Sequence, residues 1–267
     1  MTHTTSKRTW IVAAIGLLLV LGAAIGIAMP QTGEFADMAI SDIVETVIGL
    51  GAAAFIIWAA VSIGAGEPVG RQWLFIGGGV LMFAIGDVVW TVYEVFMQVD
   101  PPYPGLSDVF YLLQYPLLCA GVVMAALAYR SLLDIKVPVM VSALITAALA
   151  VPAWIFVIQP IVGDEEVSAL EKVVSAFYPL GDLVLLFAPV MFIVLVVMKL
   201  SGGLLGRPWW AVGVGLLCLA FADTVYVYLE SVEKYVSGMA IDYGWMAGLV
   251  LIAVGASLMH DIQKPAR

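Results

Sequence analysis

Charged residues are scarce in this chain. Asp, Glu, Lys and Arg together make up 12% of its 267 residues, while 63% are hydrophobic. Soluble globular domains have a hydrophobic share of only about 45–50%. The composition therefore excludes an ordinary soluble domain and predicts an all-α, polytopic membrane protein. The few basic residues form no patch that would attract nucleic acid, so a nucleic-acid partner is excluded as well.

Histidine and cysteine are also rare, with two of each. Cys119 and Cys218 lie inside apolar runs, which is typical of small core residues and not of a disulfide framework. His3 and His260 lie outside the membrane-depth parts of the apolar segments, which excludes a bis-His haem, a His-ligated zinc and a Ser-His-Asp triad there. The sequence therefore names neither a cofactor nor a metal.

Eight apolar segments are long enough to cross a bilayer, for which about 20 residues suffice. The first is longer than the ~7–15-residue core of a signal peptide, so we expect it to be retained. The connections are short, so residues 1–267 are expected to form a single integral membrane domain. The predicted segments are Trp10–Ala28, Asp42–Ile63, Gln72–Phe96, Ser107–Tyr129, Val137–Ile158, Ala169–Met198, Trp209–Ser231 and Ile241–His260.

The basic residues indicate the orientation of these segments. With eight crossings, nine of the eleven lie on one side of the membrane: Lys7, Arg8, Arg71, Arg130, Lys136, Lys199, Arg207, Lys264 and Arg267. The other side keeps Lys172 and Lys234 among several acids. Because basic loops stay in the cytoplasm, we predict a multi-pass protein of the cell membrane with both termini cytoplasmic and acidic loops facing outward.

The stretch from Ala84 to Pro116 carries polar residues inside apolar segments. Asp87, Trp90 and Glu94 are spaced i, i+3 and i+7, which places them on one helical face. After a Pro-rich turn, Asp108, Tyr111 and Tyr115 repeat this spacing. Carboxylates in membrane-spanning segments are energetically costly and usually mark a binding site or a pathway.

An internal repeat is visible in the same region. Residues 84–95 align without gaps on residues 220–231, and the alignment matches Asp87 with Asp223 and Glu94 with Glu230. Downstream, Asp108 and Tyr111 are echoed by Asp242 and Trp245. The chain then divides into halves of about 8–133 and 134–262. Four helices in each half imply parallel repeats related by an axis along the membrane normal.

The predicted topology places nine carboxylates in the outer half of the bundle: Asp42, Glu45, Asp87, Glu94, Asp108, Asp182, Asp223, Glu230 and Asp242. Asp42, Glu45, Asp108 and Asp242 are expected to open helices, where an acid also complements the helix dipole. Aromatic residues lie at the same depth. The candidate ligand-binding residues are Asp87, Trp90, Glu94, Asp108, Tyr111, Tyr115, Tyr178, Asp182, Asp223, Tyr226, Glu230 and Asp242.

No Lys, Arg or His lies at that depth to neutralise the deep acids Asp87, Asp182 and Asp223. Each must be protonated, hydrogen-bonded to a Tyr or Trp donor, or neutralised by a bound cation. Pro179 precedes Asp182 by three residues, and a kink there would either free carbonyls for a cation or only shape packing. All of these alternatives predict a polar pocket that opens outward.

The strings GDVVWTVYE, PPYPGLSDVFYLLQYP, YPLGD and ADTVYVYLE resemble the multi-helix membrane-integral sensor region of some bacterial diguanylate cyclases and related signalling proteins. The matching positions are Gly86, Asp87, Trp90, Glu94, Pro102, Pro104, Asp108, Tyr111, Tyr115, Tyr178, Pro179, Asp182 and Asp223. We expect no effector domain within these 267 residues, so the resemblance implies a sensor that acts through a separate signalling protein.

These observations favour a sensor or receptor-like membrane protein whose acidic and aromatic pocket binds a cation or a small amphipathic ligand. Its expected partners are membrane lipids and a signalling protein. The alternative is an intramembrane lipid hydrolase with Asp87 and Asp223 as acid and base, because a deep Asp in each half also resembles eight-helix hydrolases of the lysoplasmalogenase type. A cation-coupled transporter is favoured less, since the inner halves of the segments are almost uniformly apolar.

Overall fold

A computed structural model describes residues 6–29, 33–129, 136–197 and 204–264. Regular structure in these ranges is entirely helical, which confirms the predicted all-α class. Seven of the described helices have the length and hydropathy of membrane-spanning helices. The elements are α1 (Lys7–Ile27), α2 (Glu34–Gly64), α3 (Pro68–Thr91), η1 (Val92–Met97), α4 (Leu106–Tyr129), α5 (Lys136–Ala153), η2 (Trp154–Ile158), α6 (Gln159–Gly163), α7 (Ala169–Leu180), η3 (Gly181–Phe187), α8 (Ala188–Val197), α9 (Gly206–Ser231) and α10 (Asp242–Gln263).

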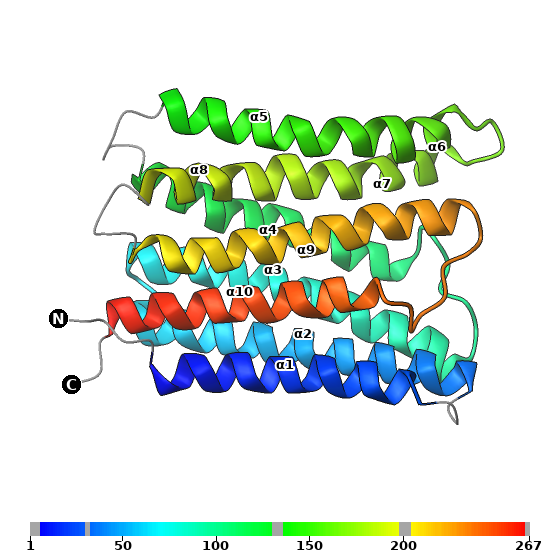
Figure 1. Ribbon diagram of the computed structural model, residues 1–267, viewed down its shortest axis with the longest axis horizontal. Coiled ribbons are helices and arrows are strands. Elements are labelled where there is room, and N and C mark those ends of the chain that lie inside the picture. Colours follow the sequence, from blue (N-terminus) through cyan, green and yellow to red (C-terminus); the bar gives the residue numbers. More distant parts are fainter. Residues whose placement is uncertain (1–5, 30–32, 130–135, 198–203, 265–267) are drawn as a thin grey trace.

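The helices lie roughly side by side along one common direction (Figure 1). α1 and α5 form opposite edges of the bundle, and α9 and α10 lie between them (Figure 1). α1 begins and α10 finishes at the same end, which we call the terminal end; the opposite end is the far end. α3 and α9 both run from the terminal end to the far end (Figure 1).

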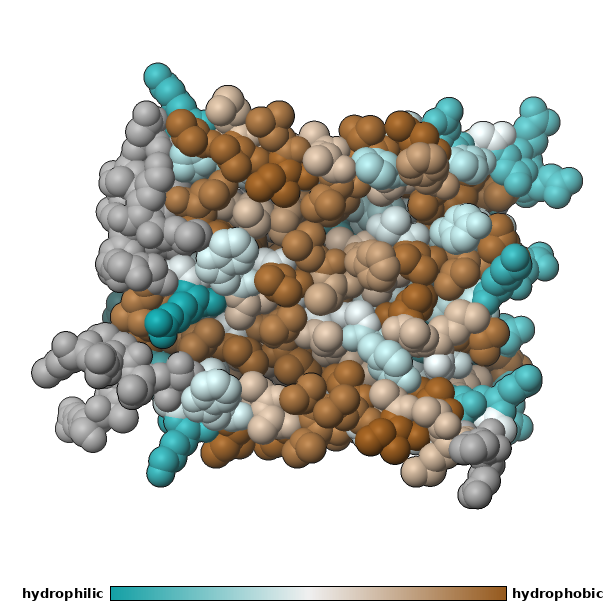
Figure 2. Space-filling view, in the orientation of Figure 1, coloured by the Kyte–Doolittle hydropathy of each residue, from teal (hydrophilic) through white to brown (hydrophobic). Residues whose placement is uncertain are grey.

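The surface of the bundle suits a lipid environment. A hydrophobic band covers its middle, and hydrophilic residues gather at the two ends (Figure 2). Large apolar side chains such as Trp10, Phe156 and Phe221 are exposed by 67%, 72% and 65%. Soluble monomers rarely expose continuous apolar surface of this kind, so this surface is typical of a membrane protein.

The second helix begins earlier than the sequence predicts. α2 starts at Glu34, and Glu34 and Asp37 occupy its first turn, where acids complement the helix dipole. Asp42 and Glu45 were expected to open this helix, but they lie inside it. The prediction that Asp42 and Glu45 open the second helix is therefore wrong, and neither acid is a helix cap.

The segment predicted as Ala169–Met198 is helical but irregular, and Met198 lies outside the described residues. α7 passes into the π-helical segment η3 and then into α8. Pro179 lies inside α7, where it lacks the N–H that an α-helix needs. A π-turn next to a proline relieves such a conflict and often marks a functional site.

α3 and α9 meet through two buried indoles. Trp73 and Trp209 are each 0% exposed and stack with ring centroids 5.6 Å apart. The two residues are equivalent in the repeat alignment, because 209 − 73 equals the offset 220 − 84. The stack closes the centre of the bundle toward its terminal end.

α3 packs on α4 through a close contact that α9 and α10 repeat. A Cβ added at Gly121 of α4 would lie 2.6 Å from the Gln72 carbonyl oxygen of α3. A Cβ added at Gly255 of α10 would lie 2.9 Å from the Pro208 carbonyl oxygen of α9. Only glycine allows these backbones to approach so closely. The two helix pairs therefore use matching glycines at matching places.

Candidate functional site

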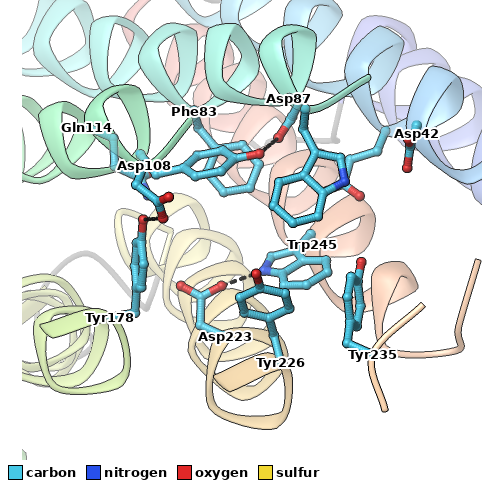
Figure 3. Close-up of a pocket in the computed structure, with 13 residues that line it drawn as sticks. Asp42, Phe83, Asp87, Asp108, Gln114, Tyr178, Asp223, Tyr226, Tyr235 and Trp245 are labelled. Carbon is cyan, nitrogen blue, oxygen red and sulfur yellow. Dashed lines mark hydrogen bonds between the residues drawn. The ribbon is translucent and has the colours of Figure 1, made fainter. Parts of the chain in front are cut away.

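A cavity opens between α2, α3, α4, α7, α9 and α10, in the half of the bundle nearer the far end. Figure 3 shows it in close-up. Its empty volume is about 650 Å³, including the part that is open to solvent. The lining residues are Asp42, Glu45, Phe83, Asp87, Trp90, Asp108, Tyr111, Gln114, Tyr178, Asp223, Tyr226, Tyr235 and Trp245.

Asp87 of α3 forms one wall of the cavity. Its Oδ1 accepts a hydrogen bond of 3.0 Å from the hydroxyl of Tyr111 on α4, as Figure 3 shows. The close approach of α3 and α4 makes this possible, since the Tyr111 ring packs where Gly86 has no side chain. Asp87 is only 6% exposed, and its Oδ2 has no hydrogen-bond partner among the described residues. One oxygen of this carboxyl group is therefore left to a ligand or a proton.

Asp223 of α9 forms the facing wall in the same manner. Its Oδ1 accepts a hydrogen bond of 2.5 Å from the indole nitrogen of Trp245 on α10 (Figure 3). Asp87–Tyr111 in one half of the chain thus corresponds to Asp223–Trp245 in the other. Asp87 and Asp223 are close enough to interact electrostatically. Two acids from distant parts of the chain therefore face one cavity.

Asp182 lies behind Asp223, in the π-helical segment η3. The Tyr115 hydroxyl donates to its Oδ1 at 2.7 Å. The carboxyl groups of Asp182 and Asp223 lie within hydrogen-bonding reach of each other. Two ionised carboxylates at this separation repel each other, so either a proton or a cation is expected to complete the pair. Asp42 and Glu94 also face each other, and Asp42 Oδ2 and Glu94 Oε2 have no hydrogen-bond partner among the described residues.

Asp108 and Asp242 begin α4 and α10 and tie down the loops before them. Asp108 accepts from the Gly105 amide and from the Tyr178 hydroxyl, each at 2.6 Å. Asp242 accepts from the Gly238 amide at 2.7 Å, and Ser41 and Tyr235 also donate to it. Both acids therefore hold the mouth of the site together, and Asp108 in addition lines the cavity.

Four aromatic rings pack against one another in the cavity wall. We call Trp90, Tyr226, Tyr235 and Trp245 the aromatic box (Figure 3). Tyr226 and Tyr235 are closest, with centroids 4.8 Å apart and planes at 83°. The ring pairs that meet in the box are steeply inclined, with interplanar angles from 65° to 83°. Edge-to-face pairs of this kind fix the rings in place.

Two tyrosines come from the far-end loops, outside the membrane-spanning segments. Burial raises the pKa of Tyr103 above its ordinary value, although its hydrogen bond with Ser175 opposes this. Burial also raises the pKa of Tyr235 well above its ordinary value, and the nearby Asp242 adds to the effect. Both phenols are therefore neutral, and the Tyr235 hydroxyl is available to donate its hydrogen bond to Asp242.

The structure brings most of the predicted site together. The predicted residues that line the cavity are Asp87, Trp90, Asp108, Tyr111, Tyr178, Asp223 and Tyr226. Tyr115, Asp182 and Asp242 contact the lining residues without lining the cavity themselves. Glu94 and Glu230 do not line it either. Glu94 misses the cavity because the π-turn η1 begins at Val92, so that the α-helical spacing no longer applies to it.

Sequence reasoning did not select several of the lining residues. The omitted residues are Asp42, Glu45, Phe83, Gln114, Tyr235 and Trp245. The repeat offered a signal for Trp245, which it matches with Tyr111. Tyr235 lies in a loop and is held at the cavity by its hydrogen bond to Asp242. No local sequence pattern predicts this contact.

Comparison of the chain with protein-family models, with curated proteins and with solved structures gives no match.

Proposed function

We propose that this protein is a membrane-integral, receptor-like sensor. A ligand enters a pocket that faces outward, and its binding alters how the helices pack. The ligand is a cation or a small amphipathic molecule. The observation that carries the proposal is the composition of the cavity wall, which has five carboxyl groups and, among its lining residues, no Lys, Arg or His. Buried acids without a basic partner favour a cation.

The proposal includes eight membrane crossings with both termini in the cytoplasm of the cell. The continuous helical run from α7 through η3 to α8 supports the additional crossing. The orientation rests on basic residues at the terminal end, of which Lys7, Arg8, Arg71, Lys136, Arg207 and Lys264 are described. Arg130, Lys199 and Arg267, which belong to the same prediction, lie outside the described residues. In this orientation the far end, with the cavity, faces outward.

The proposal also includes two parallel four-helix repeats. The repeat is supported by the stacking of Trp73 on Trp209 and by the equivalent close contacts that Gly121 and Gly255 make with the neighbouring helix. A pseudo-twofold axis between α3 and α9 would place one deep acid from each half on either side of the cavity. The signal would then pass along these helices to a separate signalling protein at the cytoplasmic end, as the resemblance to sensor regions implies.

The test of this function is ligand-dependent thermal stability of the purified protein. Wild type and Asp87→Asn are heated with a panel of divalent cations, alkylammonium ions and single-chain lipids. We expect at least one cation or lipid to raise the Tm of wild type by several degrees and to leave the Tm of Asp87→Asn unchanged. Equal responses of the two proteins, or no response to any compound, would contradict the proposal.

The second candidate function is an intramembrane lipid hydrolase. The observation that favours it is that Asp87 and Asp223 line one cavity, as an acid and base pair around a water molecule requires. Release of an aldehyde from single-chain vinyl-ether lipids, or of a fatty acid from single-chain ester lipids, abolished in both Asp87→Asn and Asp223→Asn, would establish it. A transporter is favoured less, because Trp73 and Trp209 close the path toward the terminal end.

A further inference from the structure

We propose that the ligand of the cavity carries a quaternary ammonium group, which the aromatic box holds by cation–π contact. This inference rests on the proposed function and narrows its ligand to one chemical class. Two sources of that chemistry exist, a free quaternary ammonium compound and the headgroup of a choline lipid.

The first step of the argument is the geometry of the aromatic box. The centroids of Trp90 and Tyr235 are 6.4 Å apart, and those of Tyr226 and Trp245 are 5.8 Å apart. A cation beside such a cluster lies within about 6 Å of several ring centroids, which is the range of cation–π attraction. Tryptophan and tyrosine are the strongest partners for this contact. Steeply inclined rings present faces in different directions, as a tetrahedral ammonium group requires.

The second step concerns the polar groups beside the box. Asp87 and Tyr226 are 6% and 9% exposed, and both line the cavity. The Asp87 Oδ2 and the Tyr226 hydroxyl have no hydrogen-bond partner among the described residues. Such groups are rare in folded proteins, and the open carboxyl oxygen of Asp87 is available to a positive charge in the cavity. An ammonium group next to Asp87 gains the charge of the carboxylate, while its methyl groups face the rings.

The third step distinguishes this ligand from a metal ion. In the ranges that the structure describes, no three His, Cys, Asp or Glu side chains converge to the arrangement that a metal ion needs. The acids are instead spread around the cavity wall, and many of them are engaged by tyrosine, tryptophan or backbone donors. A large cation of diffuse charge suits such a wall, because it needs nearby negative charge and not short coordination bonds.

The experiment measures binding of tetramethylammonium to the full-length protein in phosphatidylglycerol nanodiscs by tryptophan fluorescence. We expect saturable binding of tetramethylammonium, and no binding of neopentyl alcohol, a neutral analogue of similar shape that serves as the neutral isostere, at the same concentrations. Tyr226→Leu removes one ring and should weaken binding about tenfold. Tyr226→Phe keeps the ring and removes only a hydroxyl without a partner, so it should bind far more tightly than Tyr226→Leu. Tyr228→Leu, at a lipid-exposed position of the same helix, serves as the unchanged control.

The outcomes separate the inference from the proposed function. Equal binding of the neutral isostere, or wild-type binding by Tyr226→Leu, would overturn the quaternary ammonium ligand. A divalent cation that stabilises wild type and not Asp87→Asn would then still support the sensor. Nanodiscs of phosphatidylcholine distinguish the two sources, because a choline headgroup in the cavity would compete with tetramethylammonium and raise its apparent Kd.

Discussion

Replacing Asp242 with alanine is expected to lower the free energy of unfolding by about 3–5 kcal/mol. The carboxyl group is 1% exposed and accepts hydrogen bonds from Ser41 on α2 and from Tyr235 and Gly238 in the loop before α10. Alanine removes the acceptor of the buried Ser41 hydroxyl and of the half-buried Tyr235 and Gly238 donors, at about 1–3 kcal/mol for each group left unsatisfied. Reversible denaturation in mixed micelles, or the Tm in detergent, measures the loss.

Two comparisons make this result specific. Asp242→Asn keeps one acceptor oxygen and should lose less stability than Asp242→Ala. Glu34→Ala removes an exposed acid from the first turn of α2 and should change stability by no more than about 0.5 kcal/mol. An Asp242→Ala protein as stable as Glu34→Ala would mean that the contacts of Asp242 do not hold the far end together.

The second large effect is a dependence of cation binding on pH. The carboxyl groups of Asp182 and Asp223 lie side by side. We expect this pair to hold a proton that a cation seated beside Asp223 replaces. Because protons compete with the cation, binding strengthens as pH rises. If one proton leaves for each cation bound, the apparent Kd of tetramethylammonium falls about tenfold for each pH unit. Titrations at pH 5, 6 and 7 measure this slope.

Two variants assign the proton to a pair of acids. Asp182→Asn removes the partner of Asp223 and should flatten the pH dependence. Glu94→Gln removes the partner of Asp42, the other pair of facing carboxyl groups, and should leave the slope as in wild type. A Kd that is independent of pH in the wild-type protein would contradict proton exchange. If the pH dependence of Kd is lost only in Glu94→Gln, the exchanged proton belongs to the pair of Asp42 and Glu94 and not to the pair of Asp182 and Asp223.

Much of the fold follows from the sequence, because long apolar runs in a bilayer can satisfy their backbone only as helices. The irregular helical turns do not follow. The π-turn at Val92 displaces Glu94 from the face of Asp87, and the early start of α2 places Asp42 inside the helix. Hydropathy predicts neither feature, since each depends on how neighbouring helices and loops provide hydrogen bonds for a few backbone groups.

The core of the site was predictable for a different reason. Acids are rare in membrane-spanning segments, so Asp87 and Asp223 stand out without any structure. The repeat then places them at equal depth in two helices. Tyr235 and Gln114 could not be found in this way, because a tyrosine in a loop and a single uncharged glutamine inside a helix are ordinary features of a sequence. Only the packing of α4 and α10 against the remaining helices brings them to the cavity.

The most direct test of an acidic pocket that opens outward uses one cysteine and two reagents. Gln114, which lines the cavity, is replaced by cysteine in a chain whose Cys119 and Cys218 are alanine. Intact cells are treated with membrane-impermeant methanethiosulfonates, one bearing trimethylammonium and one bearing sulfonate, and each rate is divided by its rate with 2-mercaptoethanol. The account predicts that the cationic reagent reacts at least about tenfold faster, since a cleft lined by one sign of charge concentrates counter-ions. Equal normalised rates, or modification only from the cytoplasmic side of inverted vesicles, would contradict it.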